Sequence, residues 1–106
     1  MYKPLPDSVT ISQSGINGLG LFARENLEQG TNLGMSHIKV ADQIIRTPLG
    51  GFINHSNTPN CVKAELLMTN QYNMGQNYDY KKWDLILAKD VEKGEELTLK
   101  YTFYNV

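Results

Sequence analysis

The sequence predicts a mostly β domain built from small sheets, with little helix. Turn-forming residues recur about every ten positions and separate short segments in which polar and apolar side chains alternate. No stretch shows the sustained 3.6-residue apolar period of a helix longer than a turn or two. We therefore expect one compact domain over residues 1–106, because a chain of this length folds as a single unit.

The first half of the chain predicts two short strands joined by a glycine-rich turn. Residues 8–12 alternate polar and apolar side chains, which is typical of a half-buried strand. Residues 14–20 form the turn, and residues 21–23 are the second strand. Residues 40–45 fit either a short strand or a single helical turn, which Pro48 then ends.

The second half predicts three more strands. Residues 61–69 and 83–89 are strand-like, and residues 70–80, rich in Asn, Gln, Gly and Tyr, form a surface connection between them. A charged turn at residues 90–95 leads into the last strand, residues 97–103, where side chains alternate between two faces. This regular succession of strands and turns favours small sheets packed together.

Composition excludes several classes of protein. The 10 basic and 11 acidic residues leave a formal charge of −1, whereas a dedicated nucleic-acid binder carries a clear basic excess. The longest apolar run, residues 85–88, is too short to span a bilayer, and residues 1–7 lack the apolar segment of a signal peptide. The single cysteine, Cys61, cannot form an internal disulfide or a zinc cluster, and we expect it to be a small buried residue. We expect an intracellular protein without direct contact to nucleic acid or membrane.

The most distinctive segment is Asn-His-Ser-Asn-Thr-Pro-Asn at residues 54–60. We predict a loop, because Asn and Ser hydrogen-bond nearby backbone and Pro fixes φ. Asn54 and His55 offer donors and acceptors suited to a polar heterocyclic ligand, although His55 could equally be a loop histidine satisfied by backbone. The other histidine, His37, shows no metal-ligand spacing with it, so we expect no metal site.

Two further segments are ambiguous on their own. Gly18-Leu19-Gly20 lets backbone approach a ligand closely, yet it fits a plain turn as well and is not the dinucleotide fingerprint. Glu95 and Glu96 could be paired carboxylates for acid–base work, but a solvated turn rim is the simpler interpretation. Tyr101 falls on the inward face of the last strand, where tyrosine is usually a core residue with one partner for its hydroxyl.

Taken together and in this order, the three segments resemble the SET domain of protein lysine methyltransferases. They read Gly-Leu-Gly-Leu-Phe-Ala from residue 18, Phe-Ile-Asn-His-Ser-x-x-Pro-Asn-Cys from residue 52, and Lys-Gly-Glu-Glu-Leu-Thr-x-x-Tyr ending at residue 101. The resemblance runs from about Val9 to Tyr104. It implies a β-clip architecture of small sheets, in which the carboxy-terminal segment passes under a loop near the Asn-His-Ser motif and forms a pseudoknot.

The resemblance also implies a cofactor, S-adenosylmethionine, and methyl transfer to the side-chain amine of a protein lysine. Backbone around the glycine pair would contact the methionine end, Asn54 would hold its amino group, and the His55 backbone would contact the adenine. Tyr101 would be the catalytic residue, beside the sulfonium and the target amine. The residues implied for the cofactor are Gly18, Leu19, Gly20, Asn54, His55 and Tyr101. Those implied for the lysine channel are Leu99, Phe103 and Tyr104.

Two other functions stay open at this point. A β-clip module could hold cofactor or peptide without turnover, because five residues follow Tyr101 and many relatives close the lysine channel with a longer tail. A structural or oligomerisation domain could retain the same loops as packing features. The partner we expect is a protein or peptide lysine, and a second copy of the chain could cover open sheet edges as a homodimer.

Overall fold

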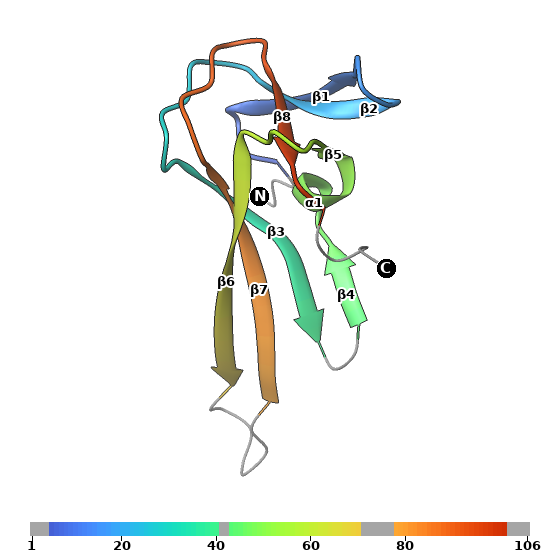
Figure 1. The fold of residues 1–106 in the computed structure, drawn as a ribbon. Coiled ribbons are helices and arrows are strands. Elements are labelled where there is room, and N and C mark those ends of the chain that lie inside the picture. Colours follow the sequence, from blue (N-terminus) through green and yellow to red (C-terminus); the bar gives the residue numbers. More distant parts are fainter. Residues whose placement is uncertain (1–4, 41–42, 71–77, 102–106) are drawn as a thin grey trace.

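The computed structural model describes residues 5–40, 43–70 and 78–101, and it confirms the mostly β class (Figure 1). A single short helix stands among the described elements, and none of the described helical structure is long and apolar enough to cross a membrane. In chain order the elements are β1 (Val9–Gln13), β2 (Leu19–Ala23), β3 (Asn32–Val40), β4 (Gln43–Arg46), α1 (Pro48–Phe52), β5 (Asn54–His55), β6 (Cys61–Asn70), β7 (Tyr78–Leu87) and β8 (Glu96–Leu99).

The strands follow the order β1-β2-β8-β6-β7-β3-β4, and β5 pairs with β8 beside this path. Neighbours along the path are antiparallel except for β8 and β6, which run parallel. Strand β5, beside the path, also runs parallel to β8. The long strands β6, β7 and β3 extend away from the end where β1, β2 and β8 cross (Figure 1). The molecule is accordingly elongated, with principal extents of 48 × 35 × 23 Å.

Strand β8 is the junction of the fold. Its Leu97 faces Leu21 of β2, and its Leu99 faces Cys61 of β6. Between them, Thr98 lies opposite a residue of β5. The carboxy-terminal motif is therefore held between the glycine-turn strand on one side and the Asn-His strand on the other.

The core gathers apolar side chains from both ends of this junction. Burying one Leu or Ile side chain contributes about 1.5–3 kcal/mol, so the cluster is the main stabilising feature that holds β8 in place. Its buried members are Val9, Leu21, Ala23, Leu27, Leu33, Leu49, Ile53, Cys61, Leu85, Leu87, Val91, Leu97 and Leu99.

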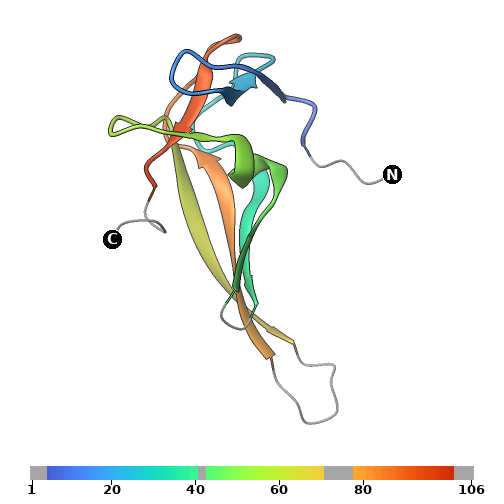
Figure 2. The ribbon, with the colours of Figure 1, turned by 90° about the vertical axis from the view of Figure 1, so that its right-hand side faces the viewer.

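Helix α1 begins where the sequence predicts a break. Pro48 occupies its first turn, where a missing N–H costs nothing and the fixed φ suits a helix. Thr47 precedes it but does not cap it with its side chain, because the Thr47 hydroxyl donates to the Met35 carbonyl of β3 at 2.6 Å. Figure 2 shows α1 beside the upper end of β3, so the helix delivers the chain to β5 from a fixed position.

Three sequence predictions need adjustment. Residues 54–60 are not all loop, because Asn54 and His55 pair with β8 as the short strand β5. Residues 40–45 resolve as strand where they are described, since β3 and β4 form an antiparallel pair. The last strand ends at Leu99, earlier than expected.

Two predicted features fall largely outside the described residues. Of the surface connection predicted at 70–80, residues 70 and 78–80 are described, and they are strand, so β6 ends later and β7 begins earlier than predicted. The passage of the tail under the loop concerns residues 102–106, which are not described. The described portion of that segment, up to Tyr101, lies next to the Asn-His strand.

Candidate functional site

The three sequence segments meet at one place. Ser56 N donates to the Leu99 carbonyl at 3.1 Å, directly after the parallel pairing of β5 and β8. Tyr101 N donates to His55 Nδ1 at 2.9 Å, and the two rings lie 5.2 Å apart between centroids. On the other side, the Asn54 side chain donates to the backbone of the glycine turn. Direct hydrogen bonds thus connect segments that lie far apart in sequence.

The Asn54 amide is the centre of this arrangement. Asn54 is buried, with 9% of its surface exposed. Four oxygens surround its Nδ2 atom at 2.9–3.2 Å, from two backbone carbonyls, a hydroxyl and a carboxylate. They are Asn17 O, Leu19 O, Ser14 Oγ and Glu96 Oε2. We call Ser14, Asn54 and Glu96 the site cluster.

Glu96 does not lie on a solvated rim as the sequence suggested. It is the first residue of β8 and is only partly exposed, and both of its carboxylate oxygens lie 2.8 Å from Ser14 Oγ. Glu95 does belong to the turn, where its Oε1 accepts a hydrogen bond from Glu92 N at 2.9 Å. The two neighbouring acids therefore have different roles.

Gly20 explains why Glu96 can turn inward. A Cβ atom on Gly20 would lie 2.4 Å from Glu96 Oε2 and 3.1 Å from Asn54 Nδ2, so the missing side chain makes the space that the carboxylate fills. The signal was in the sequence as a glycine on β2 facing an acid at the start of β8, but it depends on strand register, which the sequence does not fix. Ser14 was missed for the same reason.

The other residues of the glycine turn present backbone to the site. Gly18 has a φ of 48°, in the left-handed region that favours glycine, and its carbonyl accepts a hydrogen bond from Ser14 N at 2.8 Å. The Leu19 side chain is 52% exposed, whereas its carbonyl points toward Asn54 at 3.2 Å. The turn therefore contributes main-chain oxygens to the site.

Asn60, the last residue of the Asn-His-Ser loop, fixes β8 from the other side. Its Nδ2 donates to the Glu96 carbonyl at 2.9 Å, and its Oδ1 accepts from Thr98 N at 2.8 Å. The buried Asn60 amide thus makes the hydrogen bonds to the Glu96 carbonyl and the Thr98 N–H that a paired strand would otherwise make. The sequence showed Asn60 as part of the motif but gave it no role.

Tyr101 is placed between the loop and the end of β8. It is half-buried, and its hydroxyl donates to the Ile53 carbonyl in a short hydrogen bond. His55 is exposed beside it. Leu99 is 3% exposed and belongs to the core cluster. Of the three residues implied for the lysine channel, Phe103 and Tyr104 lie outside the described residues.

Neither a thiol nucleophile nor a metal cluster is found in the described part of the chain. Cys61 is fully buried, as expected, and burial raises the pKa of its thiol to about 12. Residues 5–40, 43–70 and 78–101 contain no group of three or more His, Cys, Asp or Glu side chains that could hold a metal ion. The chemistry available at the site is hydrogen bonding, charge and positioning.

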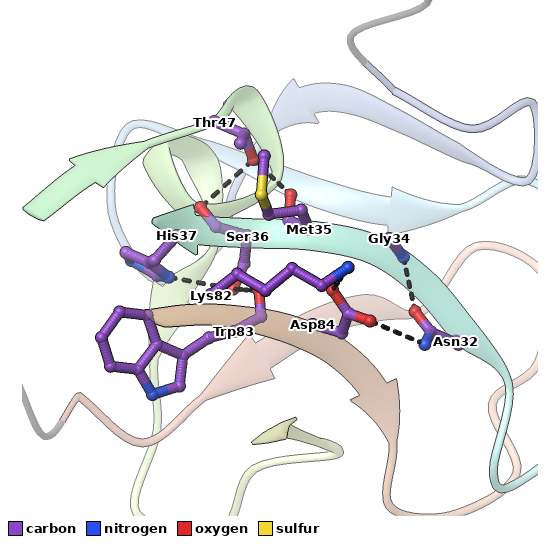
Figure 3. Close-up of polar contacts among 9 residues, drawn as sticks. All are labelled: Asn32, Gly34, Met35, Ser36, His37, Thr47, Lys82, Trp83 and Asp84. Carbon is purple, nitrogen blue, oxygen red and sulfur yellow. Dashed lines mark hydrogen bonds and ion pairs between the residues drawn. The ribbon is translucent and has the colours of Figure 1, made fainter. Parts of the chain in front are cut away.

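A second buried polar group lies between β3 and β7 (Figure 3). Ser36 Oγ donates to the Trp83 carbonyl at 3.1 Å, and His37 Nδ1 lies 2.9 Å from Ser36 Oγ. Burial lowers the pKa of His37 to about 4, and the charges of Lys63 and Arg46 act in the same direction. His37 is therefore neutral near pH 7, and Ser36, with no exposed surface, cannot meet a substrate.

Asp84 completes this second group. Its Oδ2 accepts a hydrogen bond from Asn32 Nδ2 at 3.1 Å, and its Oδ1 has no hydrogen bond but lies 3.5 Å from Lys82 Nζ (Figure 3). We call Ser36, His37 and Asp84 the sheet cluster. It joins two strands to each other and offers no surface to a ligand.

A groove of about 450 Å³ also opens on the β1–β2 side of the molecule, apart from both clusters. It shares no residue with the site cluster, so its hollow shape does not mark the place where the three motifs meet. Its lining residues are Thr10, Ser12, Phe22, Ala23, Arg24, Lys93 and Gly94.

Comparison with known proteins agrees with this arrangement. The family model of the SET domain matches residues 35–102, well over half of the chain, and includes the Asn-His and tyrosine motifs. A comparison with curated proteins finds no match. One similar solved structure is a Plasmodium falciparum protein described as a "putative histone methyltransferase", with a TM-score of 0.68 at 15% identity, covering 88% of this chain and 96% of that one. At that identity the likeness shows a common fold, and it extends over more of the chain than the family model does. By the family model and the fold together, the chain belongs to the SET-domain family.

Proposed function

We propose that the protein transfers a methyl group from S-adenosylmethionine to the side-chain amine of a lysine in a protein or peptide. The observation that carries this proposal is the direct hydrogen bonding that joins the glycine turn, Asn54 and Tyr101 around one place in a SET fold. Members of this family are usually lysine methyltransferases, and the similar Plasmodium protein is described as a histone methyltransferase.

The site cluster fits the methionine end of the cofactor. The Asn54 amide oxygen receives no hydrogen bond from any described residue, although its nitrogen is surrounded by four oxygens. That oxygen is an acceptor for an amino group, and the main chain of Gly18 to Gly20 supplies a close, side-chain-free approach. His55 is exposed, and we propose that its backbone contacts the adenine.

S-adenosylmethionine supplies an activated methyl group as a sulfonium. The protein therefore needs only to bind the cofactor and the lysine, to orient them toward each other, and to exclude water. Aligning the reacting groups can contribute up to about 7–11 kcal/mol. Tyr101 has a positioning task. Its hydroxyl donates to the Ile53 carbonyl, and a tyrosine oxygen that donates its proton can also accept from an amine N–H or a polarised C–H group. Contacts of the C–H type contribute about 0.5–1 kcal/mol each.

The lysine must reach the site uncharged. Its ordinary pKa of about 10.4 keeps it protonated near pH 7, and transfer into a channel with apolar walls lowers that value. Leu99 is the described apolar residue two positions before Tyr101, and we propose that it forms part of the wall. An aromatic and aliphatic wall would also hold the four-carbon stem of lysine.

The direct test is transfer of radiolabelled methyl groups to a panel of lysine-containing peptides and a cell lysate. We expect incorporation by the parent protein and a loss of about a hundredfold in Tyr101→Phe, which keeps the ring and removes the hydroxyl that positions the amine. Acid hydrolysis of the product should release methylated lysine. Equal transfer by Tyr101→Phe would refute the role of that hydroxyl.

Measurements of cofactor binding and of methyl transfer distinguish the proposed enzyme from a non-catalytic binding module and from a structural domain. If S-adenosylhomocysteine binds in calorimetry but no lysine substrate is methylated, the protein is a non-catalytic cofactor-binding module. If the ligand does not bind at all, the loops are packing features, and the proposal as a whole is wrong.

A further inference from the structure

Glu96 is an acid at the centre of the site cluster, and within the described part of the chain it has no basic partner. Its Oε2 lies 2.9 Å from Asn54 Nδ2, and both oxygens lie 2.8 Å from Ser14 Oγ. Among residues 5–40, 43–70 and 78–101, no lysine, arginine or histidine forms an ion pair with it. A partly buried carboxylate held by neutral donors alone has no opposite charge beside it to offset the cost of its burial.

The hydrogen-bonding capacity of the cluster is also unbalanced. The Asn54 amide brings two protons and the Ser14 hydroxyl one, while the carboxylate by itself accepts about four hydrogen bonds. The carbonyls of Asn17 and Leu19 add further acceptors within 3.2 Å of the same nitrogen. The cluster therefore holds more acceptor capacity than its own donors fill, and it lacks both protons and a positive charge.

We propose that Glu96 is the counter-ion for the α-ammonium group of the cofactor's methionine half, and that it makes the site selective for a ligand with that charge. An ammonium group supplies three protons and one positive charge, which are the two quantities that the cluster lacks. The inference rests on the proposed function, because it assumes that this site receives S-adenosylmethionine.

The position of Glu96 supports a ligand-facing role over a purely structural one. Backbone hydrogen bonds to Asn60 and strand pairing to β2 already fix β8 at this residue, so the carboxylate is not needed to hold the strand. Instead it occupies the space left by Gly20, on the side where the glycine turn presents its carbonyls. In that position the Glu96 carboxylate would contact a ligand that binds against the glycine turn.

The experiment compares two ligands and three proteins by isothermal titration calorimetry. The ligands are S-adenosylhomocysteine and its desamino analogue, in which hydrogen replaces the α-amino group. The proteins are the parent, Glu96→Gln, and Glu95→Gln as a control that removes the neighbouring charge in the turn. Glutamine keeps the shape of the side chain and its capacity to accept from Asn54 or Ser14.

We expect the parent to bind S-adenosylhomocysteine about tenfold or more tightly than the desamino analogue, since hydrogen bonds to charged groups contribute more than neutral ones. Glu96→Gln should lose about tenfold in affinity for S-adenosylhomocysteine while its affinity for the analogue changes little. Glu95→Gln should keep the parent's preference.

Other outcomes would overturn the inference. An equal loss for both ligands in Glu96→Gln would show that Glu96 only positions Asn54. A parent protein without preference would refute the counter-ion role even if the variant failed to fold. Both results leave the proposed function standing, because S-adenosylhomocysteine still binds. If the parent protein did not bind S-adenosylhomocysteine, both the proposed function and the inference would be refuted.

Discussion

The site cluster and the sheet cluster are both polar groups set among buried residues, yet they are built differently. In the sheet cluster, the paired strands β3 and β7, whose register shifts between Met35 and His37, hold Ser36 and His37 with almost no exposed surface. Their hydrogen-bond partners lie within the protein, and Asp84 Oδ1, which has no hydrogen bond, lies next to the Lys82 ammonium. In the site cluster, a turn, a two-residue strand and the first residue of β8 bring together more acceptors than donors. Satisfied polar groups stabilise a fold, whereas surplus capacity at a loop junction is typical of a ligand site.

This contrast leads to a distinction between stability and binding. Substitutions that disturb the sheet cluster should lower the free energy of unfolding, because its groups cannot reach water when their partners are lost. Substitutions at the site cluster should lower ligand affinity more than they lower the free energy of unfolding. The following tests are ordered by their expected effect on stability.

The largest effect should come from Gly50→Ala, where α1 packs on the sheet cluster. A Cβ at Gly50 would lie 2.2 Å from the Ser36 carbonyl and 2.8 Å from His37 Cε1, and a backbone oxygen cannot move aside. We expect a loss of about 3 kcal/mol or more in the free energy of unfolding. Denaturant unfolding followed by circular dichroism would measure it.

Gly51→Ala is the matched control for that variant. Gly51 lies in the same helix, and a Cβ there would meet no atom within 4 Å. Alanine is a better helix former, so we expect an increase in stability of about 0.5 kcal/mol. Similar losses in both variants would mean that the helix itself, and not its contact with the sheet cluster, determines the result.

The second test is the dependence of stability on pH, which should follow His37. Its pKa is lowered from 6.5 to about 4 in the folded protein, mainly by burial, so between these values the unfolded chain binds a proton that the folded chain does not. Stability should therefore fall as the pH falls from about 6.5 to 4, by up to about 3 kcal/mol. Unfolding curves across this range, for the parent and for His37→Gln, isolate the contribution. An identical pH profile in the variant would contradict the assignment.

Much of the fold could be predicted from the sequence because it depends on local patterns. Alternation identified β1 and β8, and residues 61–69 and 83–89 were predicted as strand-like segments that fall within or overlap β6 and β7. The three motifs and the family they resemble were visible for the same reason, since each motif is a short continuous run. The helix at Pro48 was missed because a five-residue helix has too few positions to show a period.

The site was harder to predict because it depends on register. Glu95 and Glu96 are adjacent in sequence, and only the pairing of Glu96 with Phe22 shows which of them turns inward toward Gly20. Asn54 likewise reads as a loop residue until its parallel pairing with β8 is known. A shift of one residue reverses which face a side chain occupies, so these contacts could not be derived from pattern alone.

The third test concerns Asn60, which lies at the boundary between the two kinds of cluster. Asn60→Ala would leave the Glu96 carbonyl and the Thr98 amide without their present partner, and we expect a loss of about 2 kcal/mol in the free energy of unfolding. Asn57→Ala, at an exposed position of the same loop, should change stability by less than about 0.5 kcal/mol. Equal behaviour of the two variants would refute a structural role for Asn60.

Among the four tests, the smallest loss of stability should come from Gly20→Ala. This variant allows a direct comparison of the site cluster with the sheet cluster, because Gly50→Ala makes the same change beside the sheet cluster. The added Cβ would lie 2.4 Å from Glu96 Oε2, against 2.2 Å for the clash at Gly50, but the obstacle is the end of a flexible side chain. The carboxylate can swing toward water, so we expect a cost of about 1 kcal/mol in unfolding. The affinity for S-adenosylhomocysteine should nevertheless fall about tenfold or more, because Glu96 and Asn54 are displaced together.

Gly15→Ala, in the same turn with nothing within 4 Å of the added Cβ, should change neither quantity and so controls for altered turn flexibility. Calorimetry and denaturant unfolding on the same samples separate the two effects. If Gly20→Ala unfolded as readily as Gly50→Ala, the site cluster would be as rigid a part of the scaffold as the sheet cluster. Its surplus of acceptors would then have to be explained by the folded chain itself and not by a ligand.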